Sequence, residues 1–117
     1  MRSASAELRG ERGSATAELA VALPAVAAVL AICLGAVLLT AQQVRLSDGA
    51  ADAARALGRG ESDAAAAAIA SRVAGRAVAL SSVPDGEFVC ATITAPAGGL
   101  LAAVELRASS CALAGGR

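Results

Sequence analysis

One carboxylate stands at the entrance of a long uncharged stretch. Glu18 directly precedes the run LAVALPAVAAVLAICLGAVLLTA, which occupies residues 19–41 and contains no charged side chain. An acidic side chain carried to the centre of a bilayer costs about 2.5–3.5 kcal/mol, so a Glu in this place needs a physical reason. One reason is a simple location among lipid headgroups, near the positive end of a helix, where acids are tolerated. The other is a functional role, and the residues before Glu18 bear on that choice.

Small and polar residues separate this Glu from a charged leader. Residues 1–13, MRSASAELRGERG, are polar, mixed in charge and without an apolar period, so they predict a disordered leader. Gly13 ends the leader, Ser14 follows, and Glu18 is the fifth residue after Gly13. A glycine, a short small-residue segment and a single acid therefore precede the apolar run.

The amino-acid composition argues against an enzyme and against a nucleic-acid-binding protein. The chain has no His, which removes the commonest general base and the commonest metal ligand. Its net charge is zero and its one aromatic residue is a Phe, so it shows no basic stripe with interleaved aromatics. Gly98 and Gly99 lack the strand–helix context of a phosphate loop. We expect no enzymatic activity, no metal or other cofactor, no nucleic acid and no small-molecule substrate.

The uncharged run predicts a membrane-spanning helix. At about 1.5 Å per residue, residues 19–41 extend roughly 34 Å, enough to cross the hydrocarbon core of a bilayer. The alternative is a buried core helix, but a chain of 117 residues has little else to cover such a helix on all sides.

The helix is expected to continue beyond the membrane as an amphipathic extension. After Gln42 and Gln43, apolar residues recur at helical spacing, at Leu46, Ala50, Ala53, Ala54 and Leu57. Gly58 and Gly60 then favour a stop. The sequence therefore predicts one continuous helix from about Ala15 to Leu57.

The rest of the chain predicts a small α+β domain. Ser62 is a good N-cap for a short second helix that ends at Gly75. Three strands are expected after it, over residues 78–83, 88–95 and 101–110, with turns at Pro84-Asp85-Gly86 and at Pro96 to Gly99. Short turns between strands indicate an antiparallel sheet, which would pack on the second helix and on the extension of the first.

The segment GSATAELAVALPAV, together with AQQVRLSDGAADAARALGRG, resembles the type IV pilin superfamily and, within it, the TadE-like pseudopilins of tight-adherence (Flp-type) pili. The resemblance covers residues 12–59 well. The C-terminal half resembles the family only in having a few strands and two cysteines. It implies that Gly13 precedes a cleavage point, that Ser14 becomes the new N-terminus, and that Glu18 is the fifth residue of the mature chain.

The resemblance also implies partners and a structural function. A prepilin peptidase would cleave the leader, and other pilins with the assembly machinery would be the binding partners. In a filament, the new Ser14 amine, on the same or a neighbouring subunit, would pair with the Glu18 carboxylate and set the axial register. We therefore expect a minor pilin or pseudopilin that takes part in pilus assembly; whether it is incorporated into the extracellular pilus stays open.

Two features depart from classical type IV pilins and suit TadE-like proteins better. The mature chain would begin with Ser14 instead of Phe, and Pro24 comes earlier in the span than the usual helix-bending proline. Because Pro24 lacks an N–H, it frees the carbonyl of Ala20 and predicts a mild bend of the helix.

The three cysteines fall in two different environments. Cys33 lies within the uncharged run, whereas Cys90 and Cys111 belong to the expected exterior domain. We predict a Cys90–Cys111 disulfide and a free Cys33; two free buried thiols are the alternative. A lipoprotein reading of Cys33 fits poorly, because Ile32 occupies the position where a small residue is expected.

The expected organisation is a leader (1–13), a transmembrane helix with its amphipathic extension (14–60) and a small extracytoplasmic domain (61–117). The chain would cross the cytoplasmic membrane once, with its N-terminus inside. Arginines flank both ends of the run, so charge does not set this orientation. Two alternatives stay open: an unprocessed single-span protein that scaffolds an envelope complex, and a small secreted domain cut after Ala41. A mature chain starting at Ser14, Met1 or Gln42 separates the three.

Overall fold

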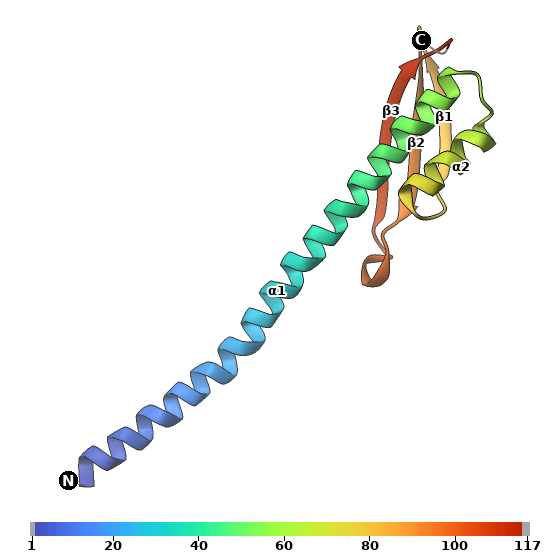
Figure 1. Cartoon of the computed structure of the whole chain (residues 1–117). Helices are drawn as coiled ribbons and strands as arrows, with labels where there is room; N and C mark the ends of the chain where they lie inside the picture. The colour runs from blue at the N-terminus through green and yellow to red at the C-terminus, as the bar shows by residue number, and fades with distance from the viewer. Residues whose placement is uncertain (1, 116–117) are drawn as a thin grey trace. The chain divides into compact units, whose positions relative to one another are not determined.

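The structure is a computed structural model that describes the backbone of residues 2–115 and the side chains of residues 13–115. It contains a long helix, a short helix and a three-stranded antiparallel sheet, which confirms the predicted α+β class (Figure 1). The chain divides into two units, Met1–Val37 and Leu38–Arg117. This division falls before the predicted boundary at residue 60, because the C-terminal part of the long helix packs within the second unit.

The long helix, α1 (Arg2–Gly58), begins well before the predicted start near Ala15. The residues ahead of Ala15 include Ala, Glu, Leu and Arg, which are good helix formers, and they contain no Pro. Extending a helix that already exists needs no new nucleus. The prediction of a disordered leader is therefore wrong for the backbone from Arg2 onward, while Met1 lies outside the described residues.

Within residues 13–37, where the side chains of the first unit are described, none is buried. The large apolar residues from Leu19 to Val37 are more than half exposed, and Val21 reaches 73%. One helix of the described chain, Gly13–Gly58, is long and apolar enough to span a membrane, and its most apolar stretch has a mean hydropathy of 2.7 with none of it buried.

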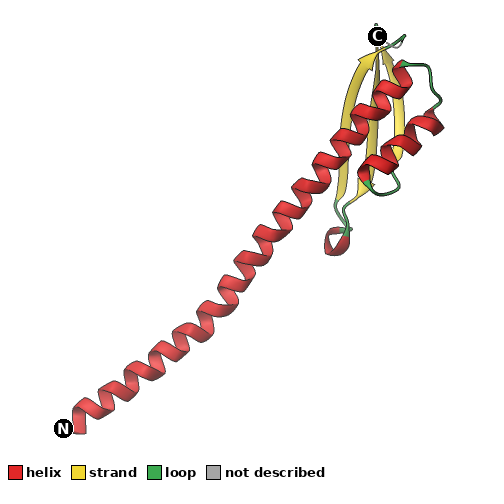
Figure 2. Ribbon diagram, viewed as in Figure 1, coloured by secondary structure: helices red, strands yellow, loops and turns green. Residues whose placement is uncertain are grey.

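In the second unit, two helices cover one face of the sheet (Figure 2). The elements are the end of α1, α2 (Asp63–Ala74), β1 (Ala79–Asp85), β2 (Phe88–Pro96), the 3-10 turn η1 (Gly99–Leu101) and β3 (Glu105–Leu113). The strands lie in the order β1-β2-β3, and each neighbouring pair is antiparallel. The sheet is thus a simple meander, as the short predicted turns indicate.

Local cap chemistry sets both ends of α2, as predicted. The Ser62 hydroxyl accepts a hydrogen bond from the Ala65 N–H at 3.1 Å and so satisfies one free donor of the first turn. Gly75 ends the helix in the left-handed conformation with φ of 73°, and its N–H bonds to the Ser71 carbonyl.

The third strand lies later in the sequence than predicted. It was expected over residues 101–110, but β3 runs from Glu105 to Leu113 because its register is set by pairing with β2, from Pro96↔Glu105 to Phe88↔Leu113. The expected turn at Pro96 to Gly99 is accordingly a longer connection that includes η1.

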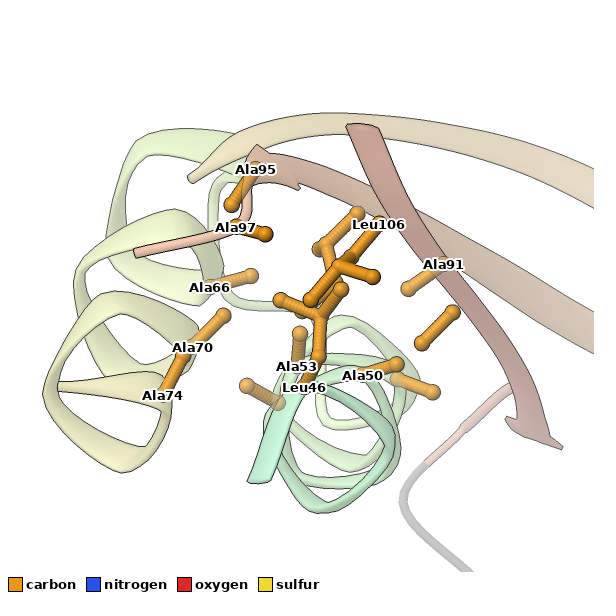
Figure 3. Packing of buried hydrophobic residues seen from close by; sticks show 14 residues of the cluster. Leu46, Ala50, Ala53, Ala66, Ala70, Ala74, Ala91, Ala95, Ala97 and Leu106 are labelled. Carbon is orange, nitrogen blue, oxygen red and sulfur yellow. The ribbon is translucent and has the colours of Figure 1, made fainter. Parts of the chain in front are cut away.

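Alanine dominates the core of the second unit. All buried core residues are Ala except Leu46, Ile93 and Leu106. Figure 3 shows side chains from α1, α2 and the sheet pointing toward one another in this core. The predicted stripe of α1 supplies part of it, because Leu46, Ala50, Ala53 and Ala54 are fully or almost fully buried, whereas Leu57 is partly buried.

Small residues bring α1 close to its neighbours. A Cβ added at Gly49 would lie 3.0 Å from the Ala70 carbonyl oxygen of α2 and 3.3 Å from the Ile93 side chain. A Cβ at Gly58 would lie only 2.6 Å from the Leu113 carbonyl oxygen. These two positions therefore require glycine for close approach of backbone to backbone.

Candidate functional site

The predicted processing residues lie on one continuous stretch of α1. Gly13, Ser14 and Glu18 are all exposed, and a Cβ added at Gly13 would meet nothing within 4 Å. Residues at positions i and i+4 are neighbours on a helix surface. An amine created at Ser14 would therefore lie one turn from the Glu18 carboxylate and could pair with it, while the open surroundings of Gly13 leave the Gly13–Ser14 bond accessible.

Glycine also makes this part of α1 easier to open. Gly in a helix interior costs roughly 1 kcal/mol relative to Ala, because it loses more backbone freedom on folding. Gly10 and Gly13 both lie inside α1, close to the Gly13–Ser14 bond. A protease that needs an extended substrate would find a helix weakened by two glycines there.

Pro24 lies inside α1 and does not end it, because the helix continues to Gly58. The missing N–H of Pro24 leaves the Ala20 carbonyl without its helical donor. The mild bend predicted from this loss stays a prediction.

The structure joins Cys90 to Cys111 by a disulfide and leaves Cys33 free and exposed, as the sequence predicts. The two bridged residues are register partners in β2 and β3. Cys111 therefore lies within β3, whereas the predicted third strand ended one residue before it, at residue 110. The bridge thus ties the last two strands together. It belongs to the second unit, whereas the processing residues, Pro24 and Cys33 belong to the first.

An apolar patch lies beside the disulfide, toward the β1–β2 turn, on the sheet face that the helices do not cover (Figure 2). Val83 is the register partner of Cys90, and Phe88 pairs with Leu113 one step further along. These three side chains are 40–60% exposed, and Phe88 is the only aromatic residue of the chain. The patch adds a feature that the sequence analysis did not single out.

Two glutamines that seemed only to mark the end of the apolar run have structural partners. The side chain of Gln42 accepts a hydrogen bond from the Gly98 N–H at 2.8 Å. That of Gln43 donates to the Arg107 carbonyl at 2.8 Å. We call these residues the glutamine clamp, because Gln42 ties the β2–β3 connection to α1 and Gln43 ties the first part of β3 to it. Their partners lie 56 and 64 residues away in the sequence, so no local pattern could reveal them.

No catalytic arrangement is evident in the part of the chain whose side chains are described. Residues 13–115 contain no group of three or more His, Cys, Asp or Glu that could hold a metal ion. An open groove of about 450 Å³ runs between α1 and β3, where it is lined by Arg55, Arg59 and small or apolar residues. Arg55 is engaged by Asp52 at 2.6 Å and Arg59 by Glu61 at 3.1 Å.

Comparison with known proteins places the chain in a family. It is 37% identical over 97 residues to a protein of Mycobacterium tuberculosis (strain ATCC 25618 / H37Rv) named apoptosis inhibitor Rv3655c, and the match covers 83% of this chain and 76% of that protein. The chain belongs to the family of this mycobacterial protein. The second unit is shorter than the matched length, so the likeness to the family member includes residues of both units. No protein-family model and no solved structure matches the chain.

Proposed function

We propose that this chain is a structural minor pilin or pseudopilin of TadE type, which takes part in assembly of a tight-adherence type IV pilus after its leader is cleaved. The observation that carries the proposal is the uncovered first half of α1. Gly13, Ser14 and Glu18 directly precede a helix whose large apolar side chains are exposed. Such a helix is covered by lipid before assembly and by neighbouring helices within a filament.

The proposed location is the cytoplasmic membrane, crossed once, with the N-terminus inside and the second unit outside. The Cys90–Cys111 disulfide supports this orientation, because disulfides persist in oxidising compartments and are rare in the cytosol. The proposed partners are a prepilin peptidase, other pilins or pseudopilins and the assembly machinery. The role is structural and not enzymatic.

In the proposed filament, Glu18 neutralises the amine of a mature subunit. Cleavage before Ser14 creates a positive charge at the start of an apolar helix, and the Glu18 carboxylate one turn away, or on a neighbouring subunit, offsets it. Breaking a buried charge pair by removing one partner costs about 3–5 kcal/mol. In the membrane the same carboxylate gives an isolated anchor no advantage.

The experiment that tests the function replaces Glu18 by Ala in the native pilus system. Glu18→Ala is expected to insert and to be processed normally, while surface pili counted by electron microscopy fall to few or none. Glu87→Ala, which removes an exposed acid from the β1–β2 turn, is the matched control and should leave pili unchanged. A normal number of pili with Glu18→Ala would return Glu18 to a simple headgroup location and remove the assembly role.

A second candidate function comes from the name of the relative, which describes inhibition of apoptosis. The 37% identity over most of the chain is the observation that favours it. The full chain reconstituted in vesicles should then lower apoptosis of cultured cells relative to empty vesicles. Equal cell death in both samples would remove this candidate and leave the pilin proposal untouched.

A further inference from the structure

The connection between β2 and β3 is apolar and largely exposed, which is unusual for a loop. Ala97 is buried and Leu101 packs partly buried against the core, whereas the other side chains are exposed, at Leu100, Ala102, Ala103 and Val104. Residues 97–104 read AGGLLAAV and contain no charged or polar side chain. Leu100 in η1 is fully exposed at 105%, and Val104 is 42% exposed. Turns and loops normally favour Pro, Asn, Asp or Ser beside Gly. Exposed apolar clusters mark contacts with proteins or membranes.

The glutamine clamp sets the level of this connection along α1. Gly98 is bonded to Gln42, which is the first residue after the uncharged run ends at Ala41. One residue corresponds to about 1.5 Å along a helix axis. The headgroup layer on each side of a bilayer is roughly 5–7 Å thick. If residues 19–41 cross a membrane, the connection therefore lies level with the boundary between hydrocarbon and headgroups.

Arg76 lies beside the connection, and Arg45 lies on α1 close to the end of the apolar run. The Arg76 guanidinium donates to the Pro96 carbonyl at 2.5 Å and comes close to Gly98. Arg45 is exposed on α1, about 6 Å beyond Ala41, which is still within the headgroup layer. Arginine at this depth is attracted to anionic headgroups. Residues 97–104 contain no acid, and the exposed Glu105 follows directly after them.

We infer that the β2–β3 connection forms a second membrane contact, in which Leu100 and Val104 enter the bilayer interface while Arg76 and Arg45 face anionic headgroups. The inference rests on the proposed membrane span of α1. Two contacts fix the tilt of the second unit on the bilayer, which a single helix cannot do. The group that covers the connection is lipid and not protein, because the connection lies where the apolar run of α1 ends.

The test uses the full chain in vesicles of phosphatidylcholine and phosphatidylglycerol, labelled at one cysteine with an environment-sensitive fluorophore. In a Cys33→Ala background with the disulfide intact, Leu100→Cys carries the probe. Glu87→Cys is the matched control, since it is exposed in the β1–β2 turn, at the other end of the sheet and away from the disulfide. The Leu100 probe should emit at shorter wavelength, be quenched by spin-labelled lipid and be quenched by aqueous iodide several-fold less than the Glu87 probe.

Labelling Cys33 in the otherwise native chain tests the membrane span of α1 separately from the membrane contact of the β2–β3 connection. A lipid-protected Cys33 with a water-exposed Leu100 overturns the membrane contact and leaves the span intact. A water-exposed Cys33 overturns the span itself. Protection of Leu100 that appears only at high protein-to-lipid ratio means that a second protein covers the loop, which also overturns the inference.

Discussion

Both halves of α1 carry apolar side chains that must be covered from water, but the two halves differ in what covers them. In residues 46–57, the sheet and α2 bury one face, whose side chains are mostly Ala, while Ser47, Asp48 and Arg55 stay exposed on the other face. Residues 19–37 carry Leu, Val and Ile, and these large side chains are exposed. Burying a Leu or Val side chain is worth about 1.5–3 kcal/mol, far more than burying an Ala. The half that has cover within the chain therefore uses small residues for close packing, and the half that must find cover outside keeps its large ones.

This contrast predicts that stability and assembly are separable. Changes in the second unit should alter its unfolding and leave the backbone protection of the first half of α1 unchanged. Hydrogen exchange of individual backbone amides reads both halves in one experiment, because it reports the free energy of opening residue by residue.

Loss of the disulfide should give the largest change in the second unit. The bridge joins residues separated by 21 positions, and a loop of this size is worth about 3 kcal/mol in the chain-entropy model. Cys90→Ala with Cys111→Ala should raise exchange of β2 amides about 100-fold. Amides of residues 19–37 should exchange as before. An equal rise in both halves would show that the halves are not independent.

The same Gly→Ala substitution, made once in each half of α1, should have different effects on the stability of the second unit. Gly58→Ala brings a Cβ to 2.6 Å from the Leu113 carbonyl oxygen and should destabilise the second unit by about 1–3 kcal/mol. Gly35→Ala is the matched change in the other half, where nothing lies within 4 Å, and it should leave protection of the second unit unchanged. Equal effects of the two variants would contradict the division of α1.

Removal of the α2 cap should have the smallest effect. Ser62→Ala removes the acceptor for the Ala65 N–H and should cost about 1 kcal/mol, seen as faster exchange in the first turn of α2. Ser47→Ala, at an exposed position of α1, is the control and should change exchange little. If Ser62→Ala leaves α2 protection intact, the cap does not stabilise the helix.

Local chemistry made much of this fold predictable from the sequence. Ser62 and Gly75 fix the ends of α2, the spacing of Leu46, Ala50 and Ala53 gives the buried stripe of α1, and β-branched residues place β2. In each case, the residues that specify the helix or strand belong to it or directly flank it in the sequence, so no distant partner is needed to recognise it.

Features that depend on distant partners could not be predicted in the same way. The run after Leu101 resembles a strand, yet β3 starts at Glu105 because pairing with β2 sets its register. The bond from Gly98 to Gln42 needs the packed helix and sheet before it can exist. For the candidate site, the residue types around Gly13 and Glu18 suggested processing, but a single chain cannot show the peptidase or the neighbouring subunits on which that role depends.

The measurement that bears most directly on the proposed pilin is the N-terminal residue of the chain purified from its native membranes, read by mass spectrometry. A processed pilin starts at Ser14, and a Gly13→Val variant retains its leader. An intact Met1 in the native chain, a start at Gln42, or normal maturation of Gly13→Val would contradict processing between Gly13 and Ser14.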